Sequence, residues 1–139
     1  MGWSLRRHLD NKAIMKHQDF EKLVIAALED LPKFFRQKMQ NVDIVIEDEP
    51  SIKQLRLFDK THQTQQELIL GLYQGIPLSN RTHLYGMVLP DKITIFKKNI
   101  ERVCQTPLQI KKVVYRTVQH EIAHHFGISD QRLREMDVY

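Results

Sequence analysis

The sequence predicts an α+β fold in a single domain, and three observations carry this prediction. A helix of about 20 residues is predicted over 107–126, because Thr106 suits an N-cap, Pro107 suits the first helical position and Gly127 follows the last turn. Short β-branched runs, VDIVIE and ITIF, are typical of strands. A length of 139 residues with 42% hydrophobic and 27% charged residues suits one globular domain with one modest core.

The elements before that helix follow from local patterns. Residues 18–40 have apolar side chains at helical spacing, with Asp19 as the expected N-cap and Pro32 as a break before a second short helical segment. Residues 42–47 alternate like a strand that the acidic EDEP segment closes. We expect residues 51–67, which are polar and lack a clean period, to form a loop with one helical turn.

The middle of the chain predicts further strands and a short helix. Residues 68–78, broken by two glycines, read as a strand or extended segment with a turn. Residues 87–96 bend at Pro90-Asp91 and continue as a strand, and proline at this point suits an edge or the beginning of a strand. Residues 97–104 are predicted to form a short helix. Gln109 completes a T-x-x-Q capping box for the long helix that follows, and apolar residues on nearly all its sides predict a central position.

The charge distribution and the cysteine content indicate which partners and which cellular compartment to expect. Residues 1–16 hold four basic side chains against one acidic side chain, a net charge of +3, which leaves +1 of the total +4 for residues 17–139. We therefore expect a flexible basic extension over 1–16 and a single domain over 17–139 that binds neither nucleic acid nor membrane. Cys104 is the only cysteine, so no internal disulfide can form, and no run of about 20 apolar residues exists. A cytoplasmic protein is the expectation.

The segment HEIAHHFGISD at 120–130 contains the residue types of a catalytic zinc site at suitable spacing. His120 and His124 are four residues apart, so on a helix they share one face and can bind one ion. Glu121 borders that face and can act as general base for a metal-bound water. Gly127 permits a sharp turn, after which Asp130 can return as the third ligand. Three protein ligands and one water describe an open catalytic site.

We expect His62, His125 and Met136 to lie outside this site. The alternative to a metal site is a buried helix with two satisfied core histidines and an aspartate in its terminal turn. We expect His62 to be a surface histidine and not a fourth ligand, and His125 to have a structural or surface role because it points away from the metal arc. Met136 comes too soon after Asp130 to serve as a metzincin Met-turn.

The sequence resembles the small bacterial zincin-like metallopeptidases over most of residues 18–135. The segments that carry the resemblance are LPKFF at 31–35, VDIVIEDEP at 42–50, LGLYQGIPL at 70–78, LPDKITIF at 89–96 and VQHEIAHHFGISD at 118–130. The resemblance implies a minimal zincin-like fold, with a central active-site helix, a small mixed β-sheet and supporting helices. It also implies Zn²⁺ on His120, His124 and Asp130, Glu121 as the catalytic carboxylate, and residues 86–96 as the edge strand that binds extended peptide.

These observations predict that the protein is a zinc-dependent metallopeptidase that hydrolyses peptide bonds in a peptide or protein substrate. One Zn²⁺ ion is expected, which is lost or exchanged for another divalent ion more readily than at a three-histidine site. Tyr73 is a candidate for steadying the oxyanion, although a packing role for it is the stronger expectation. The alternative is a metal-binding module that recognises peptides or regulates without cleaving them. A third hypothesis, metal-dependent hydrolysis of RNA, is disfavoured by the near-neutral domain and by Glu121.

Overall fold

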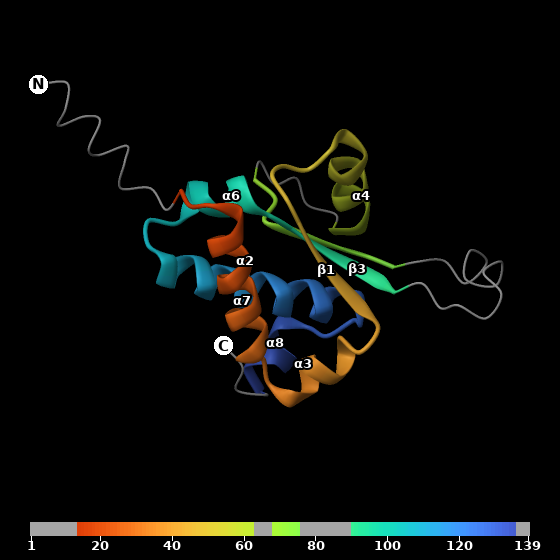
Figure 1. The fold of residues 1–139 in the computed structure, drawn as a ribbon. Coiled ribbons are helices and arrows are strands. Elements are labelled where there is room, and N and C mark those ends of the chain that lie inside the picture. The colour runs from red at the N-terminus through yellow and green to blue at the C-terminus, as the bar shows by residue number, and fades with distance from the viewer. Residues whose placement is uncertain (1–13, 63–67, 76–89, 136–139) are drawn as a thin grey trace, which may run out of the picture.

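The structure is a computed structural model that describes residues 14–62, 68–75 and 90–135, without the side chain of Asp130. It consists of helices around a small sheet, so the predicted α+β class is confirmed (Figure 1). The elements in chain order are α2 (His17–Glu29), α3 (Lys33–Lys38), β1 (Val42–Glu47), α4 (Ile52–His62), β2 (Gly71–Gln74), β3 (Asp91–Phe96), α6 (Lys97–Val103), α7 (Pro107–His125) and α8 (Asp130–Glu135). Among these helices none is both long enough and apolar enough to cross a membrane.

The described strands form one mixed three-stranded sheet in the order β1-β3-β2. β3 pairs in parallel with β1 and antiparallel with β2. The β-branched side chains of Ile93 and Ile95 are fully buried on β3, which fits a central strand. The prediction that residues 86–96 form the peptide-binding edge strand is therefore wrong for β3, and residues 86–89 lie outside the described part. Pro90 stands directly before β3, where its missing N–H costs no ladder hydrogen bond.

Helix α7 is the element against which the others are arranged, as predicted. Thr106 caps it by accepting a hydrogen bond from the Gln109 backbone N–H at 3.2 Å. The return half of the capping box differs from the prediction, because the Gln109 side chain accepts from the backbone N–H of Gln105 at 2.6 Å. The helix ends at His125, and Gly127 adopts a positive φ of 71° that turns the chain toward α8.

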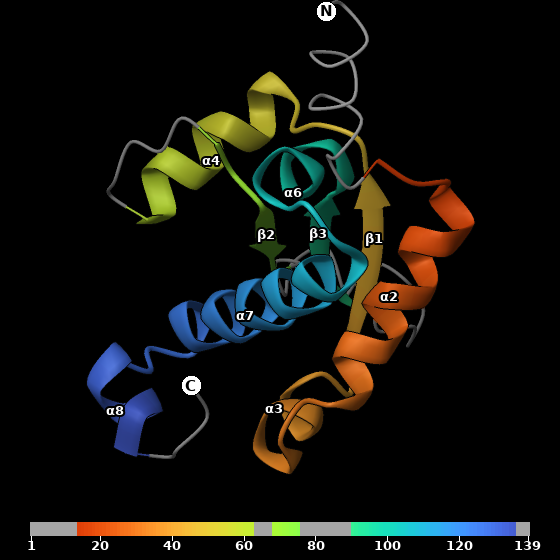
Figure 2. The ribbon, with the colours of Figure 1, turned by 90° about the vertical axis from the view of Figure 1, so that its left-hand side faces the viewer.

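The main core lies between α7, α2 and the sheet. Figure 2 shows α7 running across the strands, with α2 on the side of β1 and α4 on the side of β2. The break at Pro32 separates α2 from α3 as expected, but α2 begins at His17 with Lys16 at the N-cap, so Asp19 lies in the first turn. The helix α7 is less enclosed than its sequence suggests, because Leu108 and Phe126 are exposed. The main core consists of Phe20, Val24, Ala27, Leu31, Phe35, Tyr73, Ile93, Ile95, Ile100, Cys104, Ile110, Val114, Val118, Ile122, Ala123 and Leu133.

Helix α4 replaces the predicted loop over residues 51–67. Ser51 and Gln54 form a reciprocal capping box, with the Ser51 N–H donating to Gln54 Oε1 at 2.8 Å and the Gln54 N–H donating to Ser51 Oγ at 3.1 Å. The box starts the helix, and Phe58 anchors its single buried apolar position. Phe58 packs in a small second cluster with Ile69, Leu72 and Phe96, and no residue of α4 belongs to the main core. The prediction failed because tertiary contact through Phe58 compensates for a polar sequence.

The chain before α2 is held at Met15. Its backbone N–H donates to the buried carboxylate of Glu101 at 2.8 Å, and the same oxygen atom of Glu101 accepts from Lys97 Nζ at 3.0 Å. The Met15 side chain packs on the main core. Residues 1–13 lie outside the described part, so the flexible extension over 1–16 stays a prediction.

Candidate functional site

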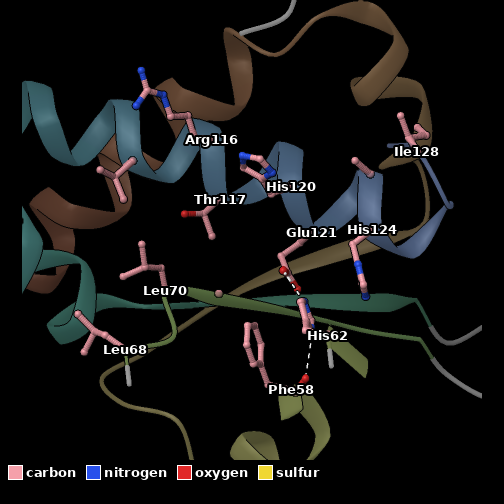
Figure 3. Close-up of a pocket in the computed structure, with 13 residues that line it drawn as sticks. Phe58, His62, Leu68, Leu70, Arg116, Thr117, His120, Glu121, His124 and Ile128 are labelled. Atoms are coloured by element: carbon pink, nitrogen blue, oxygen red, sulfur yellow. Dashed lines mark hydrogen bonds and ion pairs between the residues drawn. The ribbon is translucent and has the colours of Figure 1, made fainter. Parts of the chain in front are cut away.

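A cavity of about 560 Å³ opens along one side of α7, between this helix, β2 and the end of α4 (Figure 3). Its wall contains the two histidines and the glutamate of the sequence motif. Apolar side chains and one arginine make up most of the rest, so the motif borders a space large enough for part of a substrate. The lining residues are Phe58, His62, Leu68, Leu70, Gly71, Val113, Arg116, Thr117, His120, Glu121, Ala123, His124 and Ile128.

Gly71 permits the close approach of β2 to α7 that shapes this cavity. A Cβ atom at this position would lie 2.6 Å from Thr117 Cγ2 and 3.2 Å from the carbonyl oxygen of Thr94. Both distances are shorter than an ordinary van der Waals contact. Only glycine therefore fits between the strand and the helix without a shift of one of them.

Glu121 is buried, with 6% of its surface exposed, and both of its carboxylate oxygens are hydrogen-bonded. Oε1 accepts from the backbone N–H of Tyr73 on β2 at 2.7 Å. Oε2 lies 3.0 Å from Nε2 of His62 on α4. Because these partners come from two different elements, the carboxylate is held in one orientation at the floor of the cavity.

His62 is part of this site, so the prediction that it is a surface histidine is wrong. Its ring is stacked between Phe58, at a centroid distance of 3.8 Å, and His124, at 4.3 Å. Nδ1 lies 3.1 Å from the carbonyl oxygen of Phe58. Nδ1 also lies 2.8 Å from the hydroxyl oxygen of Thr61, which can donate to it, whereas Nε2 donates to the carboxylate oxygen of Glu121.

The surroundings of His62 change the pKa of its ring. Burial lowers the pKa of the imidazole, but the hydrogen bond to Glu121 and the negative charge of Glu121 outweigh burial, with help from the Phe58 carbonyl. The pKa of His62 is therefore raised above its ordinary value of 6.5. No sequence signal at His62 itself pointed to the site, because Glu121 is 59 residues away along the chain.

His120 and His124 both line the cavity from α7, as their spacing predicts, but their rings point in different directions. Figure 3 shows the His120 ring lying toward Arg116 and Thr117, and the His124 ring reaching toward His62. Nε2 of His124 donates to the carbonyl oxygen of Thr61 at 2.8 Å. A nitrogen that donates a proton has no lone pair for a metal, so only Nδ1 of His124 is a potential metal donor in this arrangement.

The donor set of this wall fits a zinc ion in kind. Two imidazoles one helical turn apart and an adjacent carboxylate are groups that Zn²⁺ takes in catalytic sites. Among the residues whose side chains are described, no three histidine, cysteine, aspartate or glutamate side chains are grouped closely enough to hold a metal. Asp130 is the first residue of α8, and its side chain lies outside the described part, so its role as third ligand stays a prediction.

The remaining candidates lie beside the site. Tyr73 is buried, and its hydroxyl donates to Asp91 Oδ2 at 2.7 Å, which agrees with a packing role. His125 does not line the cavity; its exposed ring stacks on Tyr73 at 3.9 Å, as expected for a structural or surface residue. Met136 lies outside the described residues. Cys104 is buried, and burial raises the pKa of its thiol, so it is a core residue.

Comparison with known proteins places the chain in a family. A solved structure that is similar to this chain, a conserved hypothetical protein from Thermo thermophilus, has 21% sequence identity and a TM-score of 0.49, with 81% of this chain and 94% of that chain covered. No curated protein matches the chain. The family model described as zincin-like metallopeptidase matches residues 39–139, which include the cavity wall and the whole motif. The chain therefore belongs to the zincin-like metallopeptidase family.

Proposed function

We propose that this protein is a zinc-dependent peptidase that cleaves peptide bonds in the cavity beside α7. The observation that carries the proposal is the presence of His120, Glu121 and His124 together on the wall of one cavity. Family membership supports a metallopeptidase. His120 and His124 are assigned to zinc, with Asp130 as the third ligand, and bound zinc supplies an acidified water and polarises the scissile carbonyl.

Glu121 is the proposed general base. Its carboxylate is buried at the floor of the cavity, so a water in front of it has few competing solvent molecules. It accepts a proton from the attacking water and delivers that proton to the leaving amine. The backbone N–H of Tyr73 keeps Oε1 in place, which leaves Oε2 as the oxygen that exchanges the proton.

The substrate is proposed to be an extended peptide lying along β2. Among the described strands β2 is the edge strand on the cavity side, because β3 lies between it and β1. Leu70 and Gly71 at its beginning line the cavity. An added peptide strand would lie along the outer side of β2, where the Tyr73 N–H is already used by Glu121, and the apolar wall would take its side chains. The strand proposed to bind the peptide is therefore β2 and not residues 86–96.

The test is an assay of unstructured peptides, with RNA as a second substrate, in the presence and absence of a chelator. We expect peptide cleavage that the chelator abolishes, and no cleavage of RNA. Glu121→Gln should retain zinc and lose about 10²–10⁴-fold in rate, the range for a positioned general base. His125→Ala is the matched control, because His125 is exposed and does not line the cavity, and it should cleave at the parent rate. Full activity of Glu121→Gln with zinc bound contradicts the mechanism.

One observation favours the alternative of a metal-binding module that does not cleave. Each oxygen of Glu121 accepts a hydrogen bond from a protein group, so one acceptor site of each oxygen is already occupied before any water binds. Such a module would bind peptide along β2 without turnover. Peptide binding that survives Glu121→Gln, with no cleavage by the parent, would support it.

A further inference from the structure

The last turn of α4 occupies the atoms that the proposed chemistry needs. The carbonyl oxygen of Thr61 takes the Nε2 proton of His124 at 2.8 Å. His62 lies 3.0 Å from the proposed proton-accepting oxygen of Glu121. The His62 ring also covers one face of the His124 ring at 4.3 Å, nearly parallel, with an interplanar angle of 11°. A single turn of α4 thus engages both a proposed zinc ligand and the proposed general base (Figure 3).

These contacts conflict with zinc binding for reasons of geometry. Two histidines at positions i and i+4 bind one ion when both rings converge on it, whereas the His124 ring is turned toward His62. The Thr61 carbonyl oxygen also engages Nε2 of His124, so this nitrogen cannot bind an ion while the turn stays in contact with α7.

The attachment of α4 allows this turn to detach without disrupting the core. Its first turn is fixed by the Ser51–Gln54 box and by the Gln54 amide, which donates to Glu47 Oε2 at the end of β1, at 3.2 Å. Farther along, Phe58 belongs to the small second cluster, and no α4 residue contributes to the main core. The last turn is therefore held mainly by Phe58 and by the polar and ring contacts to the site itself.

We propose that residues 58–62 form a latch that competes with zinc: docked, the latch holds His124 and Glu121, and zinc binds to His120 and His124 only when the latch is released. This inference rests on the proposed assignment of His124 to zinc. The apparent zinc affinity is then the intrinsic affinity reduced by the fraction of molecules with the latch open. Weakening the latch raises zinc affinity, which is the opposite of what removing a zinc ligand does.

The experiment measures zinc affinity by competition with a chromophoric chelator, using the full chain. His62→Ala removes the ring stack and the hydrogen bond to Glu121, so we expect zinc to bind about tenfold more tightly, the effect of one lost charge-assisted hydrogen bond. His62→Gln keeps an amide donor and should lie between parent and His62→Ala. Lys53→Ala, on an exposed side chain near the beginning of α4, and His17→Ala, which removes a different histidine, are controls and should match the parent.

Backbone hydrogen exchange of the parent tests the latch without any substitution. We expect zinc to accelerate amide exchange in residues 58–62, because the released turn frays. Slower exchange there on zinc binding would mean that the docked turn is part of the zinc-bound form, and would overturn the proposal. Weaker zinc binding by His62→Ala would make His62 a ligand, and unchanged binding would show that docking does not compete; both overturn it as well.

His124→Ala separates failure of the latch from failure of the zinc assignment. If His124→Ala loses zinc while His62→Ala binds it like the parent, the latch alone is overturned. If His124→Ala binds zinc like the parent, His124 is not a ligand, and both the assignment and the latch fail.

Discussion

Replacing Gly71 by alanine tests how closely β2 packs on α7 at the mouth of the site. The new methyl group would lie 2.6 Å from Thr117 Cγ2 and 3.2 Å from the Thr94 carbonyl oxygen, where carbon atoms normally sit about 3.5–4.0 Å apart. Overpacking of this kind costs about 1–3 kcal/mol. A domain of this length loses about 4 °C in Tm for each kcal/mol, so we expect Tm to fall by about 4–12 °C.

The source of the strain is identified by a second substitution. Thr117→Ser removes Cγ2, so Gly71→Ala should cost at least about 1 kcal/mol less in a Thr117→Ser background, measured as a double-mutant cycle of thermal or denaturant unfolding. Gly75→Ala is the matched control, because its nearest new contact is His125 Cε1 at an ordinary 3.4 Å. The packing argument is refuted if Gly71→Ala is as stable as Gly75→Ala, or if the cost is the same with serine at position 117.

Three further substitutions have defined outcomes. Asp130→Ala should weaken zinc binding about tenfold or more, by analogy with the loss of a residue that only supports a metal ligand, and should lose little stability. If a metal titration gives this variant the zinc affinity of the parent, Asp130 is a turn residue and not a ligand. Tyr73→Phe removes the hydroxyl that donates to Asp91, so unfolding free energy should fall by about 1 kcal/mol while zinc affinity stays unchanged, because the backbone N–H still holds Glu121. Glu101→Ala leaves a buried lysine and a backbone N–H without their acceptor and should cost about 3 kcal/mol in denaturant unfolding. Glu49→Ala, which removes an exposed ion-pair partner, should lower the unfolding free energy by about 1 kcal/mol or less. Similar losses for Glu49→Ala and Glu101→Ala would contradict the reasoning.

Some of these features were predictable because they depend on neighbours in sequence. The Thr106 cap, the proline after it and Gly127 define α7 within about a turn at each end. The i, i+4 spacing of His120 and His124 places both on the cavity wall, since a helix has the same geometry in any fold. The strand β1 and the break at Pro32 followed from similar local rules.

Other features depend on which segments meet in space, and there the sequence was a poor guide. The strand over 91–96 was recognisable, but its central place depends on β1 and β2 pairing on its two sides, which no local pattern encodes. Residues 52–62 look polar in isolation and are a helix because Phe58 finds a partner cluster formed by β2 and β3 and the chain before β2.

The sequence by itself determined the family, the long helix and the three motif residues that this helix carries, because caps, turns and helical spacing act over a few residues. Only the tertiary structure decided that His62 and Thr61 reach Glu121 and His124, 59 and 63 residues farther along the chain. Contacts at such separations arise from the packing of whole elements, since the folded chain brings the end of α4 against the face of α7 at one cavity.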